Sequence, residues 1–169
     1  GSNIFAQSTG SIGYLVGDDG TIDFQNDSTP PYYDRLGYWN TTNSRFTNPS
    51  VPTRWNVEIS FIVSSSVANS LYTYSSSVRN LSTSGDIVSI GPNINGLTGK
   101  RYTVKFENIT VPANAVANIG FRVNSLTTSN FYAIPSGATV QWTCLENPIN
   151  IGVLDMRTAL PADVKQGDL

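Results

Sequence analysis

The clearest pattern in the chain is a strict alternation of apolar and polar residues between positions 55 and 63. The apolar positions are Trp55, Val57, Ile59, Phe61 and Val63, and all of the even positions except Ile62 are polar. Side chains two residues apart lie on the same face of a strand, so this segment is expected to be a half-buried β-strand. A second alternation runs from Tyr102 to Val111; it breaks at Glu107-Asn108 and then resumes.

Shorter apolar segments between turn-forming residues predict further strands. They lie near 21–25, 38–39, 45–47, 71–75, 86–90, 118–124 and 139–145, and no helical period precedes residue 148. Short strands separated by frequent turns are typical of a β-sandwich, a barrel or a jelly roll. We therefore expect three parts: an irregular N-terminal segment 1–20, an all-β sandwich domain 21–146, and a C-terminal arm or linker 147–169.

Composition excludes several classes of partner. The 169 residues carry 13% charged side chains and a net charge of −2, and the ten basic residues are scattered. A nucleic-acid-binding protein normally presents clustered Lys and Arg, so no nucleic-acid partner is expected. Apolar runs are far shorter than the roughly 20 residues of a membrane span, so no membrane partner is expected.

The residues needed for common catalytic chemistry are missing. The chain has no histidine, which excludes Ser-His-Asp and Cys-His nucleophile systems. The single cysteine, Cys144, lies in an expected strand and is interpreted as a small, buried apolar side chain. We expect a protein that is not an enzyme and that has no cofactor and no catalytic residue.

Two carboxylate-based alternatives remain. A pair for glycoside hydrolysis is left open among Asp18, Asp19, Asp23, Asp27, Glu58 and Glu107. The aspartates between 18 and 27 have the ligand type that calcium prefers, but their spacing matches no EF-hand loop. We interpret them as turn residues and expect no metal site.

Aromatic residues next to a proline-rich loop are the candidate ligand-binding residues. Tyr32, Tyr33 and Trp39 follow Pro30-Pro31 and lie close to Asn and Asp. Exposed Tyr and Trp rings with polar neighbours suit a sugar or a protein partner. The same rings would equally suit a core or a subunit interface, and we favour that interpretation.

A longer motif around these aromatics resembles a known family. The segment 38–49, with Tyr38-Trp39, then Arg45-Phe46-Thr47 and Pro49, leads into the alternating strand opened by Trp55. This order, together with Ile134 to Trp142 near the end, resembles the C1q/TNF-like jelly roll over about residues 21–146. The sequence departs from the family at Pro52-Thr53-Arg54, which replaces the usual glycine, and in the tail after residue 146.

The low charge and the abundance of Ser, Thr and Asn look most like viral and bacteriophage structural versions of this family. The resemblance implies a homotrimer located on the virion, with aromatic and aliphatic side chains along a threefold axis, displayed as capsid decoration, fibre or host-receptor-binding knob. Its partners would be other virion proteins and a host-surface glycan or protein. The alternative is a carbohydrate-binding, lectin-like module of a secreted bacterial protein.

The tail is the last informative segment. Its apolar residues are Ile149, Ile151, Val153, Leu154, Met156, Leu160 and Val164, and Pro161 interrupts any helix that begins after Asp155. These apolar residues are too numerous for a fully exposed linker. We expect an extended or broken arm that docks on a neighbouring subunit or on another virion protein.

Overall fold

The computed structural model describes residues 4–8, 12–14, 19–22, 24, 32–40, 45–66, 69–83, 86–123 and 132–146. Within these ranges the chain forms strands and a single short 3-10 helix. The elements are β1 (Ile4–Gln7), β2 (Ile12–Tyr14), β3 (Asp19–Thr21), β4 (Tyr33–Asp34), β5 (Trp39–Asn40), β6 (Arg45–Thr47), β7 (Thr53–Ile62), β8 (Ser64–Ser65), β9 (Leu71–Asn80), η1 (Leu81–Thr83), β10 (Asp86–Ile90), β11 (Ile94–Leu97), β12 (Arg101–Val111), β13 (Val116–Val123), β14 (Tyr132–Ile134) and β15 (Thr139–Cys144).

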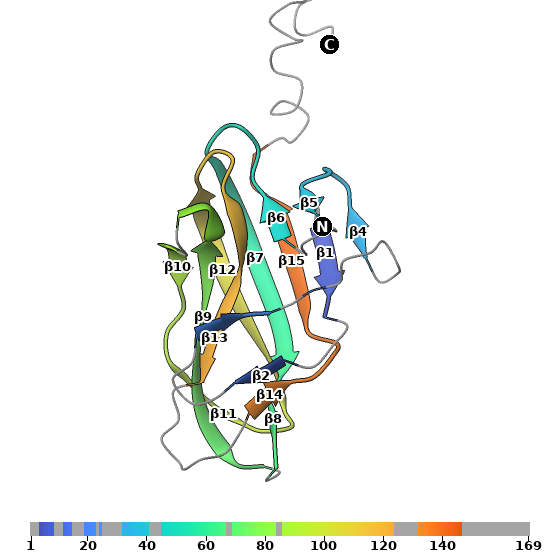
Figure 1. The fold of residues 1–169 in the computed structure, drawn as a ribbon, viewed down its shortest axis with the longest axis vertical. Helices are drawn as coiled ribbons and strands as arrows, with labels where there is room; N and C mark the ends of the chain where they lie inside the picture. The colour runs from blue at the N-terminus through green and yellow to red at the C-terminus, as the bar shows by residue number, and fades with distance from the viewer. Residues whose placement is uncertain are drawn as a thin grey trace, which may run out of the picture.

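Two antiparallel sheets face each other (Figure 1). Sheet 1 has the order β12-β7-β15-β1-β4, and sheet 2 has the order β10-β9-β13-β6-β5, with β11 also paired to β9 and β3 to β13. A small third sheet, β2-β14-β8, lies at the lower end of the sandwich in this view. Every strand pair among the described residues is antiparallel, so each sheet has one face for the core and one for solvent.

The order of pairing defines the fold. The first long-range pair joins β1 to β15, and inside it β6 pairs with β13, β7 with β12, and β9 with β10. These pairs nest inside one another along the sequence, which is the jelly-roll arrangement of two packed antiparallel sheets. The predicted all-β jelly roll is confirmed.

Large aromatic side chains fill the space between the sheets. Near one end, the Phe46 ring stacks on Trp142 with centroids 4.1 Å apart, and Trp55 meets Phe46 edge-on at 4.9 Å. In another cluster, Phe61 packs against Tyr74 and Phe121, each at 5.1 Å. These large rings therefore build the core of a single chain.

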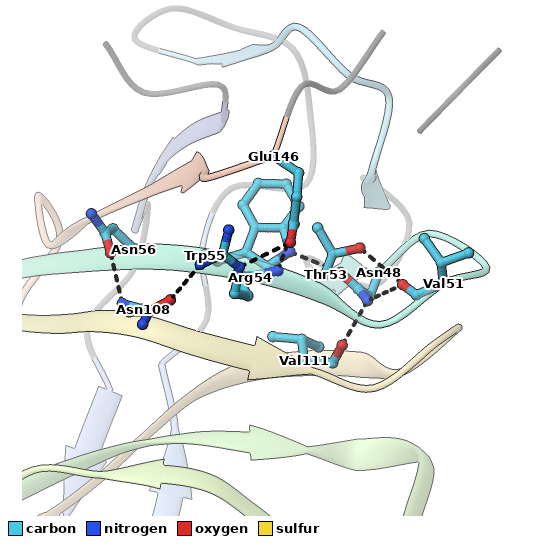
Figure 2. Close-up of polar contacts among 9 residues, drawn as sticks. All are labelled: Asn48, Val51, Thr53, Arg54, Trp55, Asn56, Asn108, Val111 and Glu146. Atoms are coloured by element: carbon cyan, nitrogen blue, oxygen red, sulfur yellow. Dashed lines mark hydrogen bonds and ion pairs between the residues drawn. The ribbon is translucent and has the colours of Figure 1, made fainter. Parts of the chain in front are cut away.

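A buried asparagine, Asn48, links the indole ring of Trp55 to the backbone of the turn before β7 and of the end of β12. Asn48 is 2% exposed, and its side-chain oxygen accepts a hydrogen bond from the Trp55 indole N–H at 2.8 Å. Its amide group donates to the carbonyl oxygens of Val111 (2.9 Å), Pro112 (3.0 Å) and Val51 (3.2 Å). Figure 2 shows this amide between the turn that precedes β7 and the end of β12.

The structure corrects the sequence interpretation mainly at the N-terminus. Segment 1–20 was expected to be irregular, but Ile4–Gln7 is a strand of sheet 1, and Ile12–Tyr14 pairs with β14. The turn-rich segment around residues 91–99 also contains a strand, Ile94–Leu97. By contrast, the expected strands at 45–47 and 86–90 coincide with β6 and β10. The predicted arm, 147–169, lies outside the described residues.

Candidate functional site

A shallow polar hollow lies on the outer face of sheet 1, where β12, β7 and β15 run side by side. It has a volume of about 170 Å³, and the buried residues Val57 and Phe106 contribute to its lining. The polar side chains that line it are Asn56, Glu58, Lys105, Glu107, Gln141 and Thr143. Each belongs to the strand positions that alternate with the buried core residues, so the strand period accounts for their shared face.

A β-bulge in β12 shapes one side of the hollow. Phe106 pairs with Val57 and Ile109 pairs with Trp55, so Glu107 and Asn108 together oppose the single residue Asn56. Both bulge residues are exposed, which is the break in alternation seen in the sequence. An extra residue bends its strand and redirects side chains, and bulges are common beside functional sites. Here the bulge brings Glu107 to the same hollow as Glu58.

Hydrogen bonds hold the bulge in place. Asn108 has a φ of 52°, and its backbone N–H donates to the side-chain oxygen of Asn56 at 2.8 Å. Asparagine tolerates this left-handed conformation better than most residues. Arg54 donates to the Asn108 side-chain oxygen at 3.4 Å and forms an ion pair with Glu146 at 3.0 Å. Figure 2 shows the bonds that connect Asn56 and Arg54 of β7 with Asn108 on one side and Glu146 on the other.

The loop that carries the predicted aromatic residues is ordered by Asp34. One carboxylate oxygen of Asp34 accepts from the backbone N–H of Gly37 (2.9 Å) and Tyr38 (3.2 Å), and the other accepts from Trp39 N–H (2.7 Å). Gly37 has a φ of 75°, which allows the chain to turn back. This loop directs Trp39 into the core, where its ring meets Phe24 edge-on at 6.1 Å.

The three predicted ligand-binding aromatics therefore have different environments. Trp39 is 5% exposed, so its ring is a core side chain, which agrees with the interpretation favoured above and excludes it as an exposed binding platform. Tyr32 packs against the core, and burial followed by the Asp34 carboxylate raises the pKa of its hydroxyl. Tyr33 is 44% exposed and stacks on Phe5 with centroids 5.7 Å apart and planes at 16°.

The carboxylates left open by the sequence are partly brought together. Glu58 and Glu107 line the same hollow, whereas Asp18, Asp23 and Asp27 lie outside the described residues and only the backbone of Asp19, in β3, is described. Within the described part of the chain, no group of three or more His, Cys, Asp or Glu residues is placed to hold a metal ion. The sequence analysis did not identify Asn56, Lys105, Gln141 and Thr143 as lining residues of a hollow. The break in alternation at Glu107-Asn108 was the available signal, because it marks the bulge beside the hollow.

Cys144 lies at the end of β15, opposite Trp55, and is partly buried against the core. Burial is the main cause that raises the pKa of its thiol. A thiol with a raised pKa contains little of the nucleophilic thiolate at neutral pH. This environment fits the structural role expected from the sequence.

In the described part of the chain, no helix is long and apolar enough to cross a membrane.

No protein-family model matches the sequence, and no curated protein matches it. Solved structures resemble the fold at low identity. A chain in the structure of infectious bursal disease virus, Gx strain, is 10% identical with a TM-score of 0.46, and the match covers 85% of this chain but 32% of the viral chain. The Eiger TNF from S. frugiperda is 8% identical with a TM-score of 0.46, covering 87% of this chain and 95% of that one.

A third similar structure is the CBM22-1 xylan-binding domain from Paenibacillus barcinonensis, 12% identical with a TM-score of 0.38, covering 86% of this chain and 97% of that one. Identities and TM-scores at this level do not transfer a function. The fold rests instead on the nested strand pairs of the chain itself. By those pairs, the chain is a jelly-roll β-sandwich with a polar hollow on the outer face of sheet 1.

Proposed function

We propose that this chain is a non-catalytic binding or assembly protein of a virus particle, displayed on the particle as capsid decoration, fibre or host-receptor-binding knob. The jelly-roll pairing carries this proposal, because it packs the apolar side chains between two sheets and leaves the outer faces of the sheets for contacts. The chain also has no histidine, the residue that most often moves protons in enzymes.

The proposed assembly is a homotrimer in which the arm, residues 147–169, makes the apolar contacts. The described surface exposes large hydrophobic side chains at separate places along the chain: Tyr33, Val51, Leu71, Ile90 and Leu145. Singly exposed apolar side chains are ordinary on a monomer surface and do not form an interface. Leu145 lies two residues before the arm, and the arm supplies the apolar residues that such an interface needs. The arm docks on the next subunit or on another virion protein.

Size-exclusion chromatography with light scattering tests the assembly. We expect the full chain to have three times its chain mass of 18.3 kDa, and a chain lacking residues 150–169 to elute as a folded monomer. A full chain that stays monomeric at micromolar concentration contradicts the trimer. If the shortened chain keeps both its oligomeric mass and its thermal midpoint, the role of the arm is wrong.

A second candidate function is a lectin-like, carbohydrate-binding module of a secreted bacterial protein. The observation that favours it is the exposed Tyr33 ring stacked on Phe5, since an exposed aromatic face can pack against the apolar face of a sugar. A glycan array with the full chain and with Tyr33→Ala measures this function. Binding that depends on Tyr33 supports it, and an array with no bound glycan counts against it.

A further inference from the structure

One transverse row of side chains crosses the whole of sheet 1. The register places Tyr33 opposite Phe5, Phe5 opposite Gln141, Gln141 opposite Glu58, and Glu58 opposite Lys105. These five residues come from β4, β1, β15, β7 and β12 in spatial order. Neighbouring strands lie roughly 4.8 Å apart, so the row extends over about 19 Å.

All five side chains lie on the outer face. On β1, β7, β12 and β15 the neighbouring residues point inward and are buried; Ile4, Val57 and Val140, for example, are at most 1% exposed. Tyr33 shares the outer face because its ring stacks on that of Phe5. Tyr33 and Lys105 are exposed, and Phe5, Glu58 and Gln141 are half-buried. The row therefore joins the exposed aromatic pair at one edge of the sheet to the polar hollow near the other edge.

The hollow end of the row offers closely spaced hydrogen-bonding groups of mixed type. Glu58 and Glu107 accept, Lys105 donates, and the Gln141 amide has both kinds of atom. Glu58 and Lys105 face each other across the ladder, yet they form no ion pair within the described part of the chain. Their charged groups are therefore not committed to each other.

The charges of the lining select against anions. Two carboxylates and one ammonium group give the hollow a net charge of −1, so phosphate, sulfate and sialic acid groups are repelled. The hollow is too weakly acidic to attract a strongly basic segment. A ligand with many neutral hydroxyl groups and flat apolar faces matches both ends of the row. Its hydroxyls can donate to the two carboxylates and accept from the Lys105 ammonium group, and a ring face packs on Tyr33 and Phe5.

We propose that this row is a binding site for an uncharged oligosaccharide that lies across the strands of sheet 1. The inference rests on the proposed function in one respect: Glu58 and Glu107 act as hydrogen-bond acceptors and not as catalytic groups. It requires neither a location on a virus particle nor a trimer. The site differs from the one expected in the sequence, because it excludes Trp39 and Tyr32 and includes Glu58, Gln141 and Lys105.

Amide NMR spectra of the full chain, titrated with defined hexasaccharides, test the site. The probes are cellohexaose, xylohexaose, maltohexaose and chitohexaose, with a heparin hexasaccharide as the anionic arm. We expect at least one neutral probe to shift the amides of Asn56–Glu58, Lys105–Asn108 and Gln141–Thr143, and the heparin probe to leave them unchanged. Shifts confined to other strands or loops, a stronger response to heparin, or no response to any neutral probe overturns the proposal.

Substitutions then assign the contacts. Glu58→Gln, Gln141→Ala and Tyr33→Ala are each expected to weaken binding of the responding probe by about tenfold, the loss of one or two hydrogen bonds or of a ring contact. Thr110→Ala, at an exposed position further along β12, is the matched control and should leave the affinity unchanged. Unchanged affinity in Glu58→Gln and Gln141→Ala, with native spectra, overturns the assignment.

Chromatography of the probes after incubation separates the two proposals. Intact oligosaccharide is expected. Hydrolysis that is lost in the Glu58→Gln and Glu107→Gln variants would overturn the non-catalytic function while leaving the binding site in place.

Discussion

Removal of the Asn48 side chain is predicted to destabilise the jelly roll strongly. The side chain is 2% exposed, its oxygen accepts one hydrogen bond, and the two hydrogens of its amide group are shared among three carbonyl oxygens. In Asn48→Ala, the Trp55 indole N–H loses its partner inside the core, at a cost of about 1–3 kcal/mol for a buried unsatisfied donor. The lost bonds to the Val111 and Pro112 carbonyls add about 1 kcal/mol each.

The expected decrease in the free energy of unfolding is therefore about 3–5 kcal/mol, a large share of the 5–15 kcal/mol typical of a domain. Urea unfolding followed by tryptophan fluorescence, at one fixed protein concentration, measures it. Asn95→Ala is the matched surface control: Asn95 is exposed, its side chain accepts from Thr73 at 3.0 Å, and a change within about 0.5 kcal/mol is expected.

A double-mutant cycle separates the orphaned indole from the other losses. In a Trp55→Phe background the indole N–H that donates to Asn48 is absent, so Asn48→Ala should cost about 1–2 kcal/mol less than it does in the unsubstituted chain. If Asn48→Ala costs less than about 1 kcal/mol, or if its cost is the same in both backgrounds, the hydrogen-bond reasoning is wrong.

Three further predictions concern other buried groups. Because burial raises the pKa of Cys144, we expect Ellman's reagent to modify it more slowly in the native chain than in urea, and equal rates contradict this. Burial, followed by the charges of Tyr74 and Tyr102, raises the pKa of Tyr72 far above its usual 10.0. The unfolded chain therefore loses this proton at a lower pH than the folded chain, so the thermal midpoint should fall as the pH rises above about 10. The fall should be smaller in Tyr72→Phe, and identical midpoint profiles of the two chains would refute the prediction. In Gly120→Ala the new methyl group would lie 2.6 Å from both the Ser77 hydroxyl oxygen and Cδ of Arg79, so a loss of about 1–3 kcal/mol is expected in urea unfolding, and an unchanged midpoint would show that both side chains move freely.

Strands with several alternating residues could be predicted from the sequence, and those held only by partners far along the chain could not. The alternation at 55–63 corresponds to β7, where it reflects one face on a large aromatic core. Strand β1 has only four residues, and its partner strand, β15, lies at the other end of the domain sequence, so no local pattern identifies β1. For Trp39 the sequence left both a core and an exposed position open, and the hydrogen bonds of the Asp34 loop turn its ring inward.

The candidate site illustrates the same limit more sharply. A break in alternation at Glu107-Asn108 was visible, and it marks the bulge that shapes the hollow. Which residues face that bulge depends on register, and register is a relation between strands that the sequence of one strand does not contain. Gln141 and Glu58 become neighbours only because the last strand of the jelly roll inserts between the first strand and β7.

That insertion also explains why the site is polar. A central strand pair of a two-layer sandwich has its inner face fully committed to the core, so only the alternate residues are free to vary for recognition. On β7 and β15 those residues are Asn56, Glu58, Ser60, Gln141 and Thr143, which offer hydrogen bonds without adding much charge. Together with Lys105 and Glu107 of β12, these residues form a surface suited to hydroxyl groups, and the experiments on Glu58 and Gln141 ask whether that surface is used.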